Sequence, residues 1–217
     1  GKKQSMMSLQ DALKKKYVSS AAYAWCLHVA YQQFISMGIP PERIRIRQHG
    51  PDERAFYAND AWDIEVLLNS FGWVEMVGVH DRGEYDLKQH AAHSKTPLEA
   101  DGAGGKIVPH VLEIAFGIDR PVFALLDLFY KKTEREEGKT RFAAPYHLAP
   151  VDVAIFPLMK KDGLSELALK IKEELERQFV VQYDDSGSIG RRYLRAAEFG
   201  TPYCITIDYD SLKKQDV

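Results

Sequence analysis

The sequence predicts an α/β (α+β) protein of two domains, and three observations support this fold class. Short segments before residue 120 alternate apolar and polar residues, which is typical of strands with one buried face. After residue 150, strand-like runs alternate with amphipathic helical patterns. A charged, proline-containing stretch, residues 131–150, lies between them like an interdomain connection. We therefore expect domains at residues 1–144 and 145–217.

The composition indicates a globular protein. The 217 residues, 45% of them hydrophobic and 28% charged, suffice for one large or two small domains with buried cores. A net charge of −2 excludes a uniformly basic nucleic-acid-binding surface but leaves local basic patches open. No apolar run approaches the roughly 20 residues that span a bilayer, and "GKKQSMMSLQ" lacks the apolar stretch of a signal peptide. We expect a cytoplasmic protein that does not contact membranes.

The cysteines and the paired histidines do not form a recognisable metal or disulfide pattern. Cys26 and Cys204 lie far apart without a CxxC spacing, so we expect two reduced, buried thiols. His90 and His93 in "HAAH" share one helical face, but no third ligand follows at a useful spacing. We therefore expect no zinc site there.

The first predicted element is a helix over Leu9–Met37. Its apolar residues recur at helical spacing, and "MGIPPER" then supplies Gly38 and Pro40, which end a helix. The chain is therefore expected to open with one long helix.

The following segment, "RIRIRQH", predicts a strand with Ile44 and Ile46 on its buried face. Its other face carries Arg43, Arg45 and Arg47. A row of arginines attracts anions or carboxylates. A solvated edge strand is the alternative that this spacing also fits.

A further strand is predicted at "GWVEMVGV". Strict alternation places Trp73, Glu75 and Val77 on one face and Val74 and Met76 on the other. Glu75 should therefore share a face with an aromatic ring.

The next strand, "VLEIAF", has one core face and one face with a carboxylate. Leu112, Ile114 and Phe116 point one way, and Val111, Glu113 and Ala115 point the other.

Behind this strand the sequence predicts a turn and a helix. Gly117 permits a tight turn, and Pro121 suits the first position of the helix "PVFALLDLFY". Arg120 then lies at the helix N-terminus, where backbone N–H groups and a guanidinium together favour a phosphate or an aromatic ring. The pattern indicates a nucleotide site, and a structural Glu113–Arg120 pair is the alternative.

The C-terminal region predicts a small α/β domain with a largely parallel sheet. Strands are expected at "VDVAIFPL", "VVQYDD" and "YCITIDYD", and helices at "LSELALKIKEELERQF" and "SIGRRYLRAAEFG". The first helix gathers its apolar residues on one face, namely Leu164, Leu167, Ala168, Ile171 and Leu175.

Several of these motifs resemble a known family. "VLEIAFGIDRPVFALL" resembles the third signature motif of class II aminoacyl-tRNA synthetases. "RIRQH", "FGWVEMVGVHDRGEYDLKQHAAHSK" and "VVQYDDSGSIGRRYLRAAEFGTPYCITIDYDS" together resemble glycyl-tRNA synthetases, from about residue 10 onward. The resemblance implies an incomplete class II catalytic core with an antiparallel sheet, followed by an α/β anticodon-binding domain.

The resemblance also implies an activity. ATP and Mg²⁺ would activate glycine to glycyl-adenylate, which a homodimeric enzyme would transfer to tRNA(Gly). Arg120 would stack on the adenine and approach the phosphates, and Glu75 would face ATP and hold Mg²⁺. Arg120 and Glu75 are thus the expected catalytic residues. The other expected ATP contacts are Val74, Met76, Glu113 and Gly117.

The implied glycine pocket departs from the family at one position. Arg82 would hold the glycine carboxylate and Glu113 the ammonium group. Ile114 and Ala115 stand where the family has proline and serine. A hydrogen bond to a charged group, about 1.5–3 kcal/mol, would be missing at Ala115. Glycine specificity would survive through lack of room, while affinity falls.

A second departure concerns the length of the chain. The first two class II motifs are not recognisable, and "PDERAFYANDAWDIEV" follows "RIRQH" and so lies in the wrong place for either. We expect a piece of a longer protein, continuing beyond "SLKKQDV", and "KTPLEADGAGGKIVPH" is a candidate junction for omitted residues. A synthetase-like nucleic-acid-binding or accessory protein without aminoacylation activity is the alternative.

The C-terminal domain resembles the anticodon-binding module of these synthetases. In "GRRYLRAAEFG", Arg191, Arg192 and Arg195 are expected to form a basic patch with Tyr193 interleaved, suited to phosphate contact and base stacking. A solvated amphipathic helix is the alternative.

Overall fold

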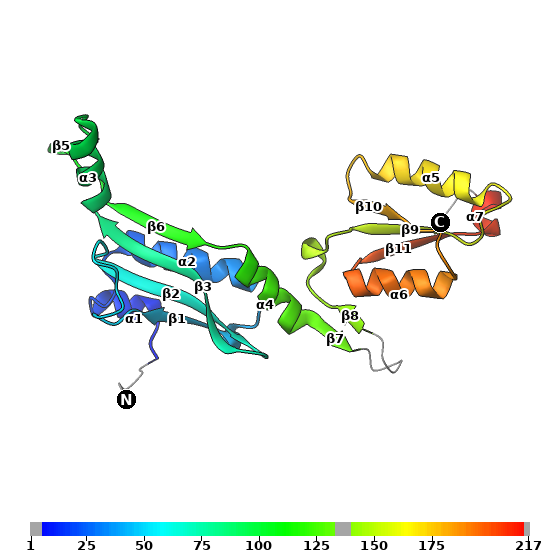
Figure 1. The fold of residues 1–217 in the computed structure, drawn as a ribbon, viewed down its shortest axis with the longest axis horizontal. Coiled ribbons are helices and arrows are strands. Elements are labelled where there is room, and N and C mark those ends of the chain that lie inside the picture. Colours follow the sequence, from blue (N-terminus) through cyan, green and yellow to red (C-terminus); the bar gives the residue numbers. More distant parts are fainter. Residues whose placement is uncertain (1–5, 133–139, 215–217) are drawn as a thin grey trace. The chain divides into compact units, whose positions relative to one another are not determined.

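A computed structural model describes residues 6–132 and 140–214. The chain divides into two compact units, Gly1–Ala124 (the first unit) and Leu125–Val217 (the second unit). The division falls within helix α4, Asp119–Phe129 (Figure 1). The predicted domain boundary at 144/145 stays a prediction.

The first unit opens with two helices, α1 (Leu9–Lys14) and α2 (Ala21–Ser36). The prediction of a single long helix was wrong, because Lys16 adopts a positive φ of 60° and turns the chain between them. The hydroxyl of Ser20 then accepts a hydrogen bond from the Tyr23 backbone N–H and begins a new helix.

An antiparallel four-stranded sheet forms the body of the first unit, which confirms the expected sheet type. Its strands lie in the order β1-β2-β3-β6 (Figure 1). They are β1 (Ile44–Gln48), β2 (Asp60–Leu68), β3 (Gly72–Gly83) and β6 (Val111–Phe116). Helix α2 packs against all four strands. Its Phe34 ring stacks on Phe116, and Val77 and Val79 are fully buried. The opposite, polar face is left for the candidate site.

A β-bulge in β3 decides which side chains reach this polar face. Ile64 pairs with Val77, but the next residue, Glu65, pairs with Glu75, so Met76 is an extra residue. Glu75 therefore lies on the polar face while Val77 points into the core. The prediction that both share a face was wrong, because the extra residue reverses the alternation.

Between β3 and β6 the chain forms a helix and a small hairpin. They are α3 (Tyr85–Ser94), β4 (Ala100–Gly102) and β5 (Gly105–Ile107).

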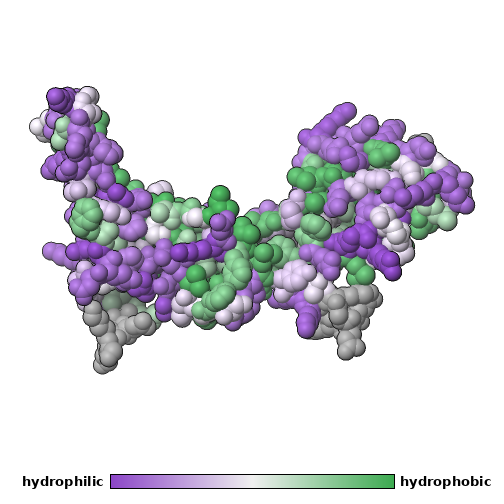
Figure 2. Space-filling model, in the orientation of Figure 1, coloured by the Kyte–Doolittle hydropathy of each residue, from purple (hydrophilic) through white to green (hydrophobic). Residues whose placement is uncertain are grey.

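Helix α4 begins two residues earlier than predicted, so Pro121 is its third residue rather than its first. Proline is tolerated there because backbone N–H groups of the first turn have no partner within the helix. Gly117 has no positive φ, so the turn before α4 does not require glycine. Apolar residues gather over α4 (Figure 2), where Ile118, Val122 and Phe123 are exposed.

The second unit contains the predicted parallel sheet, ordered β10-β9-β11. The elements in chain order are β7 (Tyr130–Lys132), β8 (Thr140–Phe142), β9 (Val153–Pro157), α5 (Leu164–Leu175), β10 (Val181–Tyr183), α6 (Ile189–Phe199), β11 (Tyr203–Ile207) and α7 (Tyr209–Lys214). Alternate residues of β9 face opposite layers: Val153 and Ile155 pack with α5, and Ala154 and Phe156 with α6. The predicted apolar face of α5 is confirmed.

Two remaining expectations can be placed on the described residues. Cys26 is buried and Cys204 is half-buried, and both are free thiols. None of the helices in residues 6–132 and 140–214 combines the length and the apolar character needed to cross a bilayer.

Candidate functional site

The polar face of the sheet carries a network of arginines and buried acids. Arg45 and Arg47 on β1 both pair with the Glu65 carboxylate on β2, and Arg47 Nη2 also donates to Asp63 Oδ2 at 2.9 Å. The Arg45 guanidinium lies 4.3 Å from the Trp73 ring centroid. These two arginines therefore bind carboxylates of the neighbouring strand.

Arg43, by contrast, does not belong to this network. It lies in the short 3-10 turn Pro41–Arg43 and donates to the Leu67 carbonyl at 2.9 Å.

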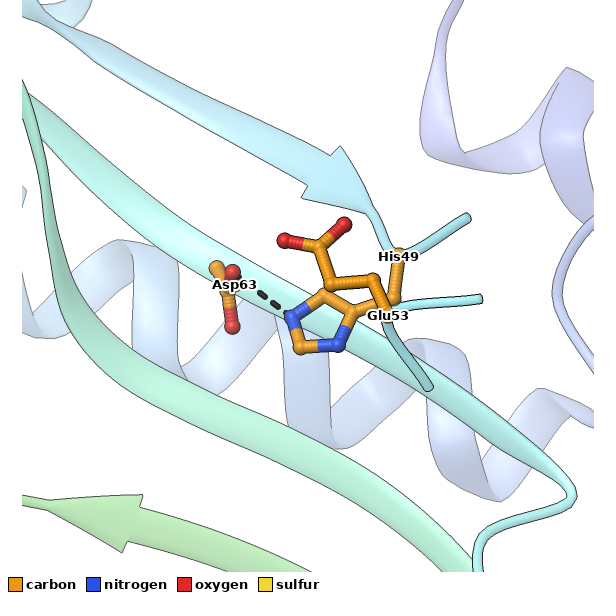
Figure 3. Close-up of side chains that lie close together, drawn as sticks. All are labelled: His49, Glu53 and Asp63. Carbon is orange, nitrogen blue, oxygen red and sulfur yellow. Dashed lines mark hydrogen bonds and ion pairs between the residues drawn. The ribbon is translucent and has the colours of Figure 1, made fainter. Parts of the chain in front are cut away.

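His49, Glu53 and Asp63 come together beside this network (Figure 3). Their nearest donor atoms all lie within 4.8 Å of one another, and His49 Nε2 is 2.7 Å from Asp63 Oδ2. Arg47 donates to both Glu53 oxygens, at 2.9 and 2.7 Å, and these bonds lower the pKa of Glu53 to about 2. Burial raises the pKa of the Asp63 carboxyl. Because Arg47 already neutralises both acids, the arrangement is that of an ion-pair network rather than a cation site.

Arg82 lies at a second bulge of β3. Asp81 pairs with Leu112 and Gly83 pairs with Val111, so Arg82 is the extra residue. Bulges of this kind redirect a side chain out of the regular alternation.

The bulge brings Arg82 onto Glu113, the other residue that the resemblance assigned to glycine. Arg82 Nη1 donates to Glu113 Oε2 at 2.6 Å, and Nε and Nη2 donate to Asp86 at 2.5 and 2.9 Å. These hydrogen bonds raise the pKa of Arg82 and lower that of Asp86. The guanidinium also lies 4.1 Å from the Tyr57 ring centroid, which fixes its plane.

A pocket of about 410 Å³ lies beside Arg82. Tyr57, Tyr85 and His110 contribute rings to its wall, and Glu84 contributes a carboxylate. Its volume lies within the range usual for small-molecule sites.

Arg120 and Glu75, predicted as catalytic residues, are also neighbours. Arg120 Nη1 donates to the Glu75 carbonyl oxygen at 3.0 Å and lies 3.3 Å from its carboxylate Oε2. Both side chains are about half exposed, at 58% and 47%. The described contacts thus pair Arg120 with Glu75 and Glu113 with Arg82, so the alternative of a Glu113–Arg120 pair is wrong.

The remaining residues that were predicted to contact ATP or glycine differ in their exposure to solvent. Met76 is only 3% exposed, whereas Val74 is half-buried. Ala115 and Gly117 are exposed, and a Cβ atom added to Gly117 would meet nothing within 4 Å.

The predicted basic patch on α6 lacks one of its three arginines at the surface. Arg192 is 4% exposed, and its guanidinium donates to backbone carbonyls at four positions, which are Pro157, Asp185, Ser186 and Gly187. Arg195 pairs with Asp184 at 2.6 Å. Expecting all three arginines at the surface was wrong, because the loop before α6 turns its carbonyls toward Arg192. Arg191 and Tyr193 remain exposed.

Sequence reasoning did not single out His49, Asp63 or His80, all on the polar side of the sheet. The available signal was strand pairing: residues directly opposite Glu113 and Ala115 on a neighbouring strand share their face. Using strand pairing in this way requires knowing which residues of two strands lie opposite each other, and the alternation of apolar and polar residues does not reveal this register.

Comparison with known proteins places this geometry in a family. Residues 152–217 match the family model "Anticodon binding domain". The glycine–tRNA ligase of Methanothrix thermoacetophila is 33% identical over 283 aligned residues, covering 95% of this chain and 49% of that protein. The glycine–tRNA ligase of Clostridium beijerinckii is 43% identical over 187 residues, covering 84% of this chain and 40% of that protein.

The fold has a solved counterpart as well. The structure of Giardia lamblia prolyl-tRNA synthetase in complex with prolyl-adenylate is similar with a TM-score of 0.59 and 16% identity, over 95% of this chain and 40% of that one. This likeness confirms the class II synthetase fold.

The archaeal alignment also bears on chain length. Its 283 positions exceed the 217 residues of this chain, so the Methanothrix protein carries residues that this chain lacks. The predicted junction at "KTPLEADGAGGKIVPH" stays a prediction. The chain belongs to the glycyl-tRNA synthetase family of class II aminoacyl-tRNA synthetases, and it spans about half the length, 40–49%, of the two curated relatives described here.

Proposed function

We propose that the protein containing this chain is a glycine–tRNA ligase. A glycine carboxylate oxygen would attack the α-phosphorus of ATP, forming glycyl-adenylate as the α–β bridging bond breaks and pyrophosphate leaves. The terminal hydroxyl of tRNA(Gly) would then attack the glycyl carbonyl carbon, and AMP would leave. We further propose that the complete protein acts in the cytoplasm as a homodimer.

The observation that carries this proposal is the Arg82–Glu113 pair on the polar face. Its atoms lie 2.6 Å apart, and both side chains are partly exposed, at 21% and 35%. A guanidinium beside a carboxylate is complementary to an amino-acid zwitterion, because the first binds its carboxylate and the second its ammonium group. The neighbouring pocket leaves room for a small ligand.

Arg120 and Glu75 suit the ATP half of the reaction. The exposed Arg120 guanidinium, in the first turn of α4, would stack on adenine and stabilise charge on the phosphates. Glu75 offers one exposed carboxylate, and magnesium in nucleotide sites commonly takes one or two carboxylates together with phosphate oxygens and water. Bound magnesium would neutralise the phosphates. The open space at Gly117 would admit ATP close to the backbone.

The second unit would bind the anticodon. Arg191 and Tyr193 are the exposed members of the predicted patch and would contact phosphate and stack on a base. Arg195, whose side chain is 41% exposed beside Asp184, would lie next to that surface, and the buried Arg192 would support it from within.

The test is glycine-dependent exchange of pyrophosphate into ATP by the complete protein encoded by the gene. Arg120→Ala should lower kcat/KM by at least about tenfold, or about 1.4 kcal/mol of transition-state stabilisation. Arg177→Ala, which removes an exposed arginine of the second unit, is the matched control and should leave exchange unchanged.

Two outcomes would count against the proposal. Unchanged exchange in Arg120→Ala would remove the role given to this arginine. Binding of tRNA(Gly) by a wild-type protein without exchange would instead indicate the nucleic-acid-binding alternative.

A further inference from the structure

One histidine on the polar face has no role in the function described so far. His80 lies on β3 directly opposite Glu113 on β6, and Gly78 lies opposite Ala115. Paired residues share a face, so all four belong to the polar side of the sheet. The His80 side chain is 17% exposed.

The ring of His80 occupies the space that a side chain at position 78 would need. A Cβ atom on Gly78 would lie 2.8 Å from His80 Cε1 and 3.6 Å from Nδ1. The imidazole also meets the His49 ring edge-on, with centroids 6.1 Å apart. The glycine therefore lets the imidazole lie against the sheet next to the Ala115 position.

His80 Nδ1 is a buried nitrogen with no hydrogen-bond partner within the described part of the chain. Buried polar atoms are nearly always paired, so one that is not requires an explanation, such as a ligand that completes its bonding. Its nearest acidic atom is Glu113 Oε2, at 3.9 Å. One ammonium nitrogen can lie about 2.8 Å from each of two atoms at this separation and donate a hydrogen bond to both.

We propose that His80 is a specificity-determining residue of the glycine site formed by Arg82 and Glu113, and this inference rests on the proposed function. The ammonium group of glycine donates to Glu113 Oε2 and to His80 Nδ1, while Arg82 binds its carboxylate. The imidazole thus supplies the polar contact that Ala115, lacking a hydroxyl, cannot. Its ring also fills the space above Gly78, which excludes amino acids with a side chain.

The two roles can be separated by substitution in the complete protein, with pyrophosphate exchange measured for glycine and for alanine. His80→Ala removes both the acceptor and the ring, so the KM for glycine should rise about tenfold with kcat nearly unchanged, and alanine-dependent exchange should rise relative to glycine. His80→Phe keeps the ring volume and removes the acceptor, so the KM for glycine should rise while alanine stays excluded.

A second substitution tests the replacement of the hydroxyl. Adding Ala115→Ser to His80→Ala should restore part of the affinity for glycine. The control is His93→Ala, since His93 is exposed on α3, and this variant should match the wild type.

The outcomes distinguish this inference from the proposed function. A wild-type protein without glycine-dependent exchange would overturn the proposed function. Active wild type with unchanged KM for glycine in His80→Ala and His80→Phe would overturn only the role of His80. Should thermal unfolding show that His80→Ala does not fold, His80→Phe decides alone, and an unchanged KM in that variant overturns the inference.

Discussion

Arg192 shows how a residue that reads as a nucleic-acid contact can serve the fold. Its guanidinium donates to Pro157 at the end of β9 and to Asp185 and Gly187 in the loop before α6. A lysine could not reproduce this planar fork of donors. Arg191, one residue earlier, faces solvent.

We expect Arg192→Ala to destabilise the second unit, because four backbone carbonyls lose a charged donor. Leaving buried acceptors unpaired costs about 1–3 kcal/mol, which corresponds to hydrogen exchange of the β9 and β11 amides becoming faster by about 5- to 150-fold. Arg191→Ala is the matched control and should change stability by less than about 0.5 kcal/mol. Similar exchange rates in the two variants would contradict this role.

A functional residue could be predicted from the sequence only where it belongs to a recognisable motif. Arg82, Glu113, Arg120 and Glu75 were selected from motifs, and the structure brings them together as two pairs. Their roles stay predictions. Arg192 was misjudged because its acceptors are backbone carbonyls, which every sequence contains and no composition reveals.

At the scale of elements, α6 ends in a glycine that the packing requires. Gly200 has a φ of 72°, and the Gly200 and Thr201 backbone N–H groups donate to Ala197 and Ala196. A Cβ atom there would lie 2.8 Å from the Phe142 carbonyl oxygen on β8. Gly190, near the start of the same helix, has open space around it and no positive φ.

These two glycines should respond oppositely to alanine. Gly200→Ala should lower the free energy of unfolding by at least about 1–2 kcal/mol, because the left-handed conformation disfavours a side chain and Phe142 must also move. Gly190→Ala should be neutral or stabilising by up to about 1 kcal/mol, because alanine favours helix. Hydrogen exchange of the α6 amides measures both, and faster exchange in Gly190→Ala than in Gly200→Ala would refute the assignment.

Helices and strands were predicted correctly where apolar residues recur at a regular spacing. They were missed where ion pairs between strands allow acidic residues to be buried. The parallel sheet and helices of the second unit follow from their alternation. Strand β2 was not predicted, and its Asp60, Asp63 and Glu65 are buried although acidic residues are depleted in strands. Arg47, on the neighbouring strand, makes the burial of Asp63 and Glu65 tolerable.

At the scale of the whole molecule, the two units carry different kinds of candidate surface. The first unit offers the polar face with its paired charges, and the second matches an anticodon-binding family. The resemblance predicted a catalytic domain followed by an anticodon-binding domain, whereas alternation alone predicted only two α/β regions.

We expect the 217-residue chain by itself to show no glycine-dependent pyrophosphate exchange. Adenylate formation relies mainly on positioning of the reacting groups, and the motif that would hold the α-phosphate is not recognisable in this sequence. The complete protein, assayed in parallel, is the positive control. Exchange by the purified chain would show that its own residues hold the α-phosphate.

Because Met76 is an extra residue in β3, the positions that face the charged side of the sheet change from odd-numbered to even-numbered at this point. Before it, odd-numbered positions such as Trp73 and Glu75 face the charged side of the sheet, and after it even-numbered positions such as Gly78 and His80 do so. Deleting Met76 would therefore make Glu75 and Val77 consecutive residues of a regular ladder, and both halves of the strand would keep their present faces. A relative that lacks the bulge therefore aligns correctly only with a one-residue gap at Met76, and an ungapped alignment would match core positions to ligand-facing positions in one half of the strand.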